Sequence, residues 1–240
     1  MKTVAFFGAS TGVGLSALKS TLAAGHQCIA LCRTPSKLTA VFPRDSTPNL
    51  RIVEGNAHDI AAVTKCLQIV DGQFVDVVVS TIGAKPNMFL QMDDPTVCEK
   101  GAKTLIEAIS ALRKSGTVGN PQIIVVSTVG LSRFGRDCPA VLHFLYGLFI
   151  KGPHADKVAM EDIVIASGET WNVVRCSFLD WHYGESTRTI RVGIEDPKTG
   201  VEVKEHGWTI SREDAGKWIA EELVIKRDAK YVDRTVSITN

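Results

Sequence analysis

Residues 4–18 read Val4-Ala-Phe-Phe-Gly8-Ala-Ser-Thr-Gly12-Val-Gly14-Leu-Ser-Ala-Leu18, an apolar run followed by a glycine-rich turn and then by a pattern of helical period. This order is typical of a buried strand, a phosphate-binding loop and a helix whose N-terminus faces an anion. Gly8 allows a tight turn, Gly12 a close approach to a diphosphate, and Gly14 close packing of helix on strand. The spacing predicts a nucleotide site rather than a purely structural turn, and its loop also contains Ser10, Thr11 and Val13.

The other half of such a site is expected at the end of the next strand. Residues 28–32 form a short, continuous apolar run typical of a strand buried on both faces. In an NAD site an acidic residue near this point binds the ribose hydroxyls, whereas an arginine suits the 2′-phosphate of NADP. The sequence has Arg33 here and Lys37 one turn later. A guanidinium can bind phosphate through two hydrogen bonds, so we expect NADP as the cofactor; the alternative is a solvated cation at a strand end.

Strand and helix patterns alternate over most of the chain. Strands are expected at residues 3–7, 27–31, 51–54, 75–80, 122–127 and 171–175, and helices at 13–24, 36–41, 59–67, 96–114 and 155–167. Such alternation indicates parallel strands joined by right-handed crossovers. We therefore predict an α/β fold of the Rossmann type, with a doubly wound, mainly parallel sheet.

The C-terminal third has a different pattern. Residues 188–194 and 201–205 flank a turn-forming segment at 196–200, which indicates a hairpin. Ser211 is a candidate N-cap for a helix that reaches about residue 225, and residues 235–239 are expected as a strand at the sheet edge. Because no Pro- or Ser-rich linker divides the chain, we expect one domain over residues 1–240, with residues 176–210 as a small substrate-side excursion.

Composition narrows the classes of partner. A net charge of +1 does not indicate nucleic acid or a membrane surface as partner. No apolar stretch reaches the ~20 residues of a membrane span, and no secretory signal precedes the first strand. The six cysteines are scattered without metal-site spacing and are expected to be reduced core thiols. We expect a cytoplasmic protein, monomer or homodimer, that binds small molecules and no metal.

Several stretches together carry a resemblance to a known family. They are residues 8–14, 31–38, 53–56, 78–83, 125–128, 156–157, 161, 171–175 and 210–215. Through them the chain resembles, nearly end to end, the atypical short-chain dehydrogenase/reductase group, particularly its NmrA-like and biliverdin-reductase-B-like NAD(P)-binding members. The resemblance implies that Asn56 lies by the adenine, that Ser80, Thr81 and Gly83 line the adenosine side, and that Lys157 holds the nicotinamide ribose.

One departure from that family concerns the proton donor. Tyrosine-dependent relatives carry a serine and then Tyr-x-x-x-Lys, so that the lysine lies on the same helix face as the tyrosine and lowers its pKa. Ser127 and Lys157 match the serine and the lysine, but the tyrosine position holds Pro153. Proline cannot donate a proton and fits the first turn of a helix. The usual tyrosine chemistry is therefore not expected.

Other residues could supply the proton. His154 adjoins the vacant position, and His182 and Tyr183 follow the sixth strand, beyond the carboxyl ends of the strands where α/β sheets bind ligands. The candidate catalytic residues are Lys157, Ser127, His154, His182 and Tyr183. Each has a structural alternative. Lys157 could be a solvated lysine, Ser127 could tie the end of a strand, and His154 could be a histidine at a helix start without chemistry. His182 and Tyr183 could be surface or packing residues.

Three functions fit these features. The first is an NADP(H)-dependent oxidoreductase that acts on a small hydrophobic substrate, which would fit secondary metabolism. The cofactor would bring hydride chemistry, and the protein orientation and a proton source. The second is a non-redox isomerase or cyclase on the same scaffold, which Pro153 favours. The third is an NmrA-like redox-sensing regulator that binds NADP without turnover.

Overall fold

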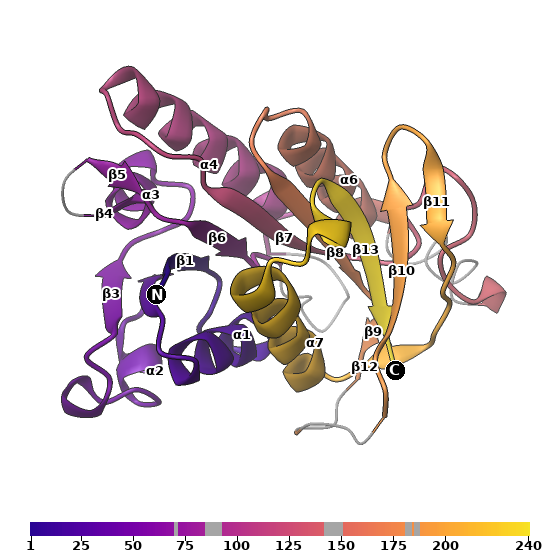
Figure 1. Cartoon of the computed structure of the whole chain (residues 1–240), viewed down its shortest axis with the longest axis horizontal. Helices are drawn as coiled ribbons and strands as arrows, with labels where there is room; N and C mark the ends of the chain where they lie inside the picture. Colours follow the sequence, from indigo (N-terminus) through magenta and orange to yellow (C-terminus); the bar gives the residue numbers. More distant parts are fainter. Residues whose placement is uncertain (70–71, 85–92, 142–150, 181–183, 185–187) are drawn as a thin grey trace.

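The computed structural model describes residues 1–69, 72–84, 93–141, 151–180, 184 and 188–240. At its centre lies a nine-stranded sheet in the order β11-β10-β13-β8-β7-β6-β1-β2-β3 (Figure 1). Seven neighbouring strands are parallel. They are β3 (Leu50–Glu54), β2 (Gln27–Cys32), β1 (Thr3–Phe7), β6 (Val77–Ser80), β7 (Gln122–Thr128), β8 (Trp171–Cys176) and β13 (Arg234–Thr239). The strand order reverses between β1 and β6, which confirms the predicted doubly wound, Rossmann-type fold.

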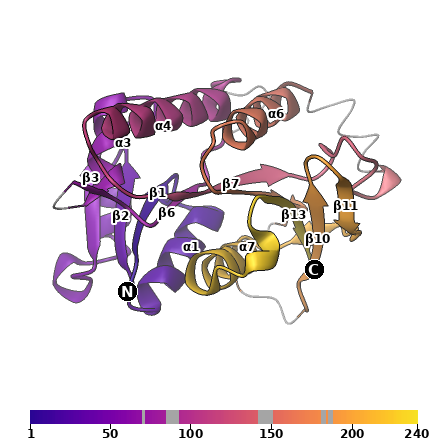
Figure 2. The same cartoon turned by 45° about the horizontal axis from the view of Figure 1, so that its top comes forward.

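The sheet separates two apolar cores. Side chains alternate across a strand, so in β1 Val4 and Phe6 enter one core while Ala5 and Phe7 enter the other. The core of Val4 is covered by α1 (Gly12–Ala23) and α7 (Arg212–Trp218), and α7 continues into the π-helical η2 (Ile219–Lys226). The other core is covered by α3 (Ile60–Leu67), α4 (Val97–Lys114) and α6 (Lys151–Ile165); Figure 2 shows the two helix layers.

Shorter elements complete the described fold. α2 (Ser36–Thr39) and the 3₁₀ turn η1 (Arg44–Ser46) follow β2, and a second 3₁₀ turn, η3 (Ala229–Tyr231), precedes β13. Two small two-stranded sheets pair β4 (Gln68–Ile69) with β5 (Gln73–Phe74), and β9 (Phe178–Leu179) with β12 (Thr209–Ile210). The second pair matters for the site because it joins the segment after β8 to the segment before α7.

The position of the last strand differs from the one expected from the sequence. The last strand was predicted at the sheet edge, but β13 lies inside the sheet, parallel to β8 and antiparallel to β10 (Arg191–Asp196). The hairpin of β10 and β11 (Gly200–Val203) takes the outer positions, so much of the predicted excursion extends the sheet (Figure 1). The hairpin itself is confirmed, and Asp196 closes its turn by accepting hydrogen bonds from the Lys198 and Thr199 amides.

Pro153 lies near the N-terminal end of the described part of α6. The described helix begins at Lys151, four residues before the predicted start, and Pro153 is its third residue. Asp156 then accepts hydrogen bonds from the amides of Cys98 (3.0 Å) and Glu99 (2.8 Å). Asp156 thus caps the N-terminus of α4 from a neighbouring helix.

Among the described residues, no helix combines the length and the apolar character that a bilayer span demands.

Candidate active site

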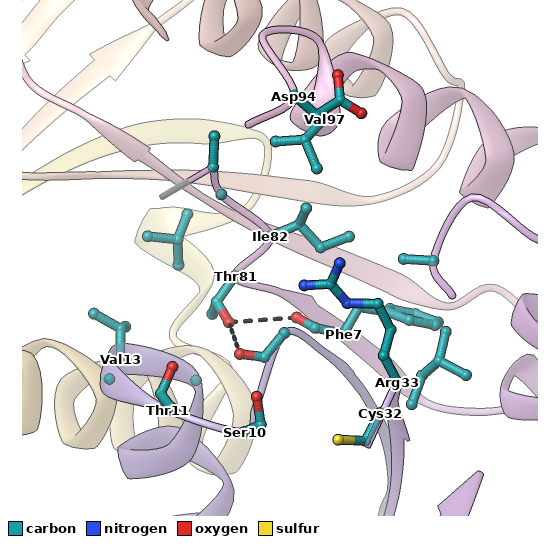
Figure 3. Close-up of a pocket in the computed structure, with 18 of the residues that line it drawn as sticks. Phe7, Ser10, Thr11, Val13, Cys32, Arg33, Thr81, Ile82, Asp94 and Val97 are labelled. Atoms are coloured by element: carbon teal, nitrogen blue, oxygen red, sulfur yellow. Dashed lines mark hydrogen bonds between the residues drawn. The ribbon is translucent and has the colours of Figure 1, made fainter. Parts of the chain in front are cut away.

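A cavity of about 1000 Å³ runs across the carboxyl ends of the parallel strands (Figure 3). Its described wall is built from the loops after β1, β2, β3 and β6, from the ends of β7 and β8, and from the start of α7. It crosses the reversal of strand order between β1 and β6, where sheets of this type bind ligands.

Two positions of the glycine loop, Gly8 and Gly14, have no room for a side chain. Gly8 has a φ of +87°, and a Cβ on it would lie 2.9 Å from the carbonyl carbon of Thr81. The Thr81 hydroxyl donates to the carbonyl oxygens of Phe7 (3.3 Å) and Gly8 (3.1 Å), as Figure 3 shows. A Cβ on Gly14 would lie 2.3 Å from that hydroxyl oxygen. The loop therefore needs glycine at both positions.

The start of α1 fits a phosphate group. Gly12, Val13 and Gly14 line the cavity, and the first amides of a helix have no acceptor within the helix. The side chain of Thr11, the N-cap residue, makes no capping hydrogen bond, and no acidic residue lies in the first turn. The positive end of the helix thus faces the cavity, with no acidic side chain in its own first turn. Ser10 and Thr11 also line the cavity and bring hydroxyl groups to this loop.

Cations lie at the tip of β2. Arg33 extends from the end of the strand into the cavity (Figure 3), and Thr34 and Lys37 line the wall beside it. The carboxylates of this cavity, Asp93 and Asp94, come instead from the segment before α4. The predicted phosphate-binding residues of both loops are therefore brought together.

The neighbouring wall follows β3. The exposed Asn56 accepts a hydrogen bond from the His58 amide (3.2 Å), and His58 Nε2 lies 3.1 Å from the Val97 carbonyl oxygen. Asn56, His58 and Val97 all line the cavity, as do Thr81 and Gly83. This end of the cavity is the one expected to take adenosine.

Lys157 lines the cavity from α6. Its Nζ donates to the carbonyl oxygens of Ile82 (3.0 Å) and Val126 (2.7 Å), at the ends of β6 and β7. The ammonium group is therefore fixed by two strands and is not a solvated surface charge. The residue lines the cavity, and it follows by four residues Pro153, which stands where tyrosine-dependent relatives carry the tyrosine.

Ser127 is tied to a buried ion cluster. Its hydroxyl donates to Glu161 (2.5 Å), and Glu161 in turn accepts hydrogen bonds from Arg175 Nε (3.2 Å) and Nη2 (2.7 Å). Arg175 also pairs with Glu195 (3.2 Å) and Asp137 (3.6 Å). Burial alone would lower the pKa of the Arg175 guanidinium, but the hydrogen bonds and charge of Glu161, followed by the charges of Glu195 and Asp137, raise its pKa. Ser127 lines the cavity, yet its proton is already engaged.

Not every predicted site residue belongs to this wall. Ser80 is buried in β6, and neither Ser80 nor His154 is among the residues that form the described part of the cavity. At the end of β6 the cavity wall is formed by residues 81–84, which follow the strand, and not by the buried Ser80 within it. His182 and Tyr183 lie outside the described residues.

The sequence analysis missed several parts of the wall, among them the segment after β8 and the start of α7. Phe178 and Leu179 line the cavity after β8, and Arg212 reaches it from the first residue of α7. Residues 210–215 had been noted only as part of the family resemblance, because an arginine next to a helix cap carries no local sign of a ligand. Ser211 does cap α7, accepting a hydrogen bond from the Asp214 amide (2.9 Å).

The cysteines behave as the sequence predicts. All six are buried and free. Burial raises the pKa of the Cys176 thiol to about 12 and, as the main cause, that of Cys98 to about 11. Within the parts of the chain that the structure describes, no group of His, Cys, Asp and Glu side chains has the arrangement of a metal site.

Comparison with known proteins gives relatives that span the whole chain. Residues 8–225 match the family described as NAD(P)H-binding. A reductase of Aspergillus terreus, pytE, is 37% identical, covering 99% of this chain and 97% of its own length. An oxidase of Aspergillus niger, pynE, is 30% identical, covering 99% and 98%.

Solved structures share the fold. A short-chain dehydrogenase/reductase of Veillonella parvula in complex with NADP superposes with a TM-score of 0.72 at 13% identity, covering all of this chain and 94% of its own. The Escherichia coli protein ChuY, described as an anaerobillin reductase, superposes with a TM-score of 0.66 at 18% identity, covering 98% and 96%.

Proposed function

Because the chain belongs to the family of NAD(P)H-binding proteins, we propose that it is an NADP(H)-dependent oxidoreductase of the atypical short-chain dehydrogenase type, acting on a small hydrophobic molecule. The proposal is carried by one observation: the uncapped start of α1 and the cation at the tip of β2 face the same cavity. A diphosphate and an additional phosphate on the adenosine would meet complementary charge at these two places.

We propose one direction for the cofactor in the cavity. The diphosphate would lie on the amides of Gly12 to Gly14, with the hydroxyls of Ser10 and Thr11 beside it. Arg33 and Lys37 would hold the 2′-phosphate, and Asn56 would lie by the adenine. The nicotinamide half would then point along the β6, β7 and β8 ends toward Lys157. We propose that Lys157 binds the ribose of that half, since two backbone carbonyls already fix its ammonium group.

The substrate would occupy the end of the cavity at β8. Phe178 and Leu179 give this end an apolar wall, and Thr128 and Ser177 line the cavity beside them. Such a wall suits a small hydrophobic compound, as natural products often are. Nicotinamide supplies hydride chemistry when bound, and the chain's own residues hold the reactants and exclude water.

The proton would not come from a helix tyrosine. Pro153 occupies that position, and the Ser127 hydroxyl is engaged with Glu161. We infer that the proton reaches the substrate from water in the cavity or from His182 or Tyr183. The names of the two fungal relatives, a reductase and an oxidase, support redox chemistry. The second candidate, a non-redox isomerase or cyclase, is favoured by the same shortage of proton donors.

Binding and turnover test the proposal separately. The purified protein should bind NADPH more than about tenfold tighter than NADH, because charged hydrogen bonds to a phosphate contribute about 1.5–3 kcal/mol each. It should then consume NADPH with at least one member of a panel of quinones and conjugated carbonyl compounds. Equal affinity for both dinucleotides would remove the NADP assignment. Tight binding with no oxidation, but with rearrangement of a panel compound, would favour the second candidate.

A further inference from the structure

We propose that His58 recognises the adenine base of the cofactor by accepting a hydrogen bond from its exocyclic amine. This inference rests on the proposed function and adds a residue that selects the base, whereas Arg33 selects the 2′-phosphate. Three features carry it: the place of His58 in the cavity, the hydrogen bond that fixes its ring, and the side-chain amide of Asn56 beside it.

His58 lies in the loop after β3, on the adenosine side of the cavity. β3 pairs with β2, and Arg33 follows the last residue of β2. An arginine at this strand tip suits a phosphate on the adenosine ribose, so the base would extend from there toward the loop after β3. Asn56 and His58 belong to that loop, and both line the cavity.

The ring of His58 is held in one tautomer. Its Nε2 lies 3.1 Å from the carbonyl oxygen of Val97, the first residue of α4. A carbonyl oxygen can only accept a hydrogen bond, so Nε2 carries the hydrogen and Nδ1 of the neutral ring is an acceptor. Nδ1 receives no hydrogen bond from the part of the chain that the structure describes. The half-buried side chain therefore keeps one acceptor for a ligand.

The side chain of Asn56 adds a donor to this acceptor. Its Oδ1 accepts a hydrogen bond from the His58 amide (3.2 Å), which fixes the orientation of the side-chain amide and leaves Nδ2 for a ligand. Adenine presents its amine, a donor, beside a ring nitrogen that accepts. With the amine on His58 Nδ1, the neighbouring ring nitrogen would accept from Asn56 Nδ2. The two residues would thus bind a donor and an acceptor that lie side by side on the base.

This pattern would select against a base without the amine. Hypoxanthine has a carbonyl oxygen in that place, so two acceptors, the oxygen and His58 Nδ1, would face each other. Because the bond to Val97 fixes the tautomer, the neutral ring cannot offer a hydrogen at Nδ1 without losing that bond. A site built to accept from an amine rejects the analogue that lacks it, since its own polar group is left without a partner.

The test compares NADPH with deamino-NADPH, which carries hypoxanthine in place of adenine. The wild-type protein should bind NADPH more tightly. In His58→Gln the amide nitrogen can replace Nε2 and keep the bond to Val97, but the Nδ1 acceptor is lost. The preference for NADPH should therefore fall about threefold to tenfold, which corresponds to one neutral hydrogen bond. His58→Asn keeps an acceptor near the place of Nδ1 and should retain more of the preference.

His26→Gln is the matched control. His26 precedes β2 at the amino ends of the parallel strands and is not part of the described cavity wall, so its replacement should leave the preference unchanged. A preference that fell as far in this variant as in His58→Gln would show a general effect on the fold and overturn the inference.

The remaining outcomes separate the possible roles of His58. Unchanged affinities in His58→Gln would overturn the inference and leave the amine to Asp93 or Asp94, which line the same cavity. Equal weakening of both dinucleotides would make His58 a structural support of its loop and overturn it too. A preference lost equally in His58→Gln and His58→Asn would also overturn it, because the Nδ1 acceptor would not explain the loss. A wild-type protein that bound neither dinucleotide would overturn the proposed function, whereas equal wild-type affinity for both would overturn this inference alone.

Discussion

Replacing Glu161 by glutamine tests whether the Ser127 network serves the fold rather than the chemistry. Glu161 and Arg175 have side chains only 5% and 6% exposed, and Glu161 accepts two hydrogen bonds from Arg175 and one from Ser127. Glutamine keeps the shape but removes the charge and turns one acceptor into a donor. Breaking a buried pair from one side costs about 3–5 kcal/mol. Since Glu195 and Asp137 still face the guanidinium, we expect a loss at the lower end, about 3 kcal/mol.

Urea unfolding and thermal melting measure this loss. For a chain of this length, 3 kcal/mol corresponds to a decrease in Tm of about 6–12 °C. Asp162→Asn is the matched control, because its pair with Arg133 is on the surface, with side chains 51% and 66% exposed, and contributes no more than about 1 kcal/mol. NADPH affinity should stay within about twofold in both variants, since neither residue forms the described wall.

A Glu161→Gln protein as stable as the control would refute the reasoning. So would a stable variant that bound NADPH normally and lost turnover, because Ser127 and Glu161 would then act in the reaction. The double variant Glu161→Met with Arg175→Met should not recover the stability, because it takes the guanidinium away from the Glu195 and Asp137 carboxylates as well.

Four further predictions concern residues that line the cavity. Arg33→Asp should weaken NADPH about tenfold to a hundredfold more than NADH in a fluorescence titration; equal losses would remove Arg33 from the 2′-phosphate site. Gly14→Ala should lower the free energy of unfolding, measured by urea titration, by about 1–3 kcal/mol and should weaken cofactor binding, because its Cβ would lie 2.8 Å from the Gly8 carbonyl oxygen. Wild-type affinity for the cofactor would contradict this. Lys157→Ala should weaken NADPH while 2′,5′-ADP, which lacks the nicotinamide half, binds as before; an equal effect on both ligands would make Lys157 a support of the whole cavity. Cys176, whose pKa burial raises to about 12, should stay protonated at neutral pH and react with a thiol reagent only after unfolding; rapid modification of the folded protein would show that it is accessible.

The parallel part of the fold could be predicted because its signals are local. Runs such as residues 122–128 are buried on both faces, and an apolar run of strand length indicates this without knowledge of the partner strands. The predicted boundaries of these strands differ from the structure by no more than two residues. The place of β13 could not be predicted in the same way. Whether a final strand lies inside or at the edge depends on pairing with β8 and β10, and its own sequence does not specify the partners.

The same distinction applies to the candidate site, whose residues are placed either by a local sequence signal or by packing between distant segments. The glycine loop and Arg33 were found because both follow directly from the strand that positions them. Arg212 was missed because it reaches the cavity through the packing of α7 on α1, which lies about 200 residues away in sequence. The roles of Asp156 and Glu161 were missed for the same reason. A carboxylate that caps another helix or pairs with a buried arginine looks like any other helix carboxylate in the sequence.

The cap that Asp156 provides for α4 has a consequence for how the molecule folds. The two amides it accepts from are 57 and 58 positions away, so the first turn of α4 is completed only when α6 has docked. A fragment that ended before α6 would leave those amides without their acceptor, and α4 would fray at the end that leads into the cavity. The two crossover helices of the β6-β7-β8 half of the sheet are therefore coupled, and α4 and α6 should unfold together instead of one after the other.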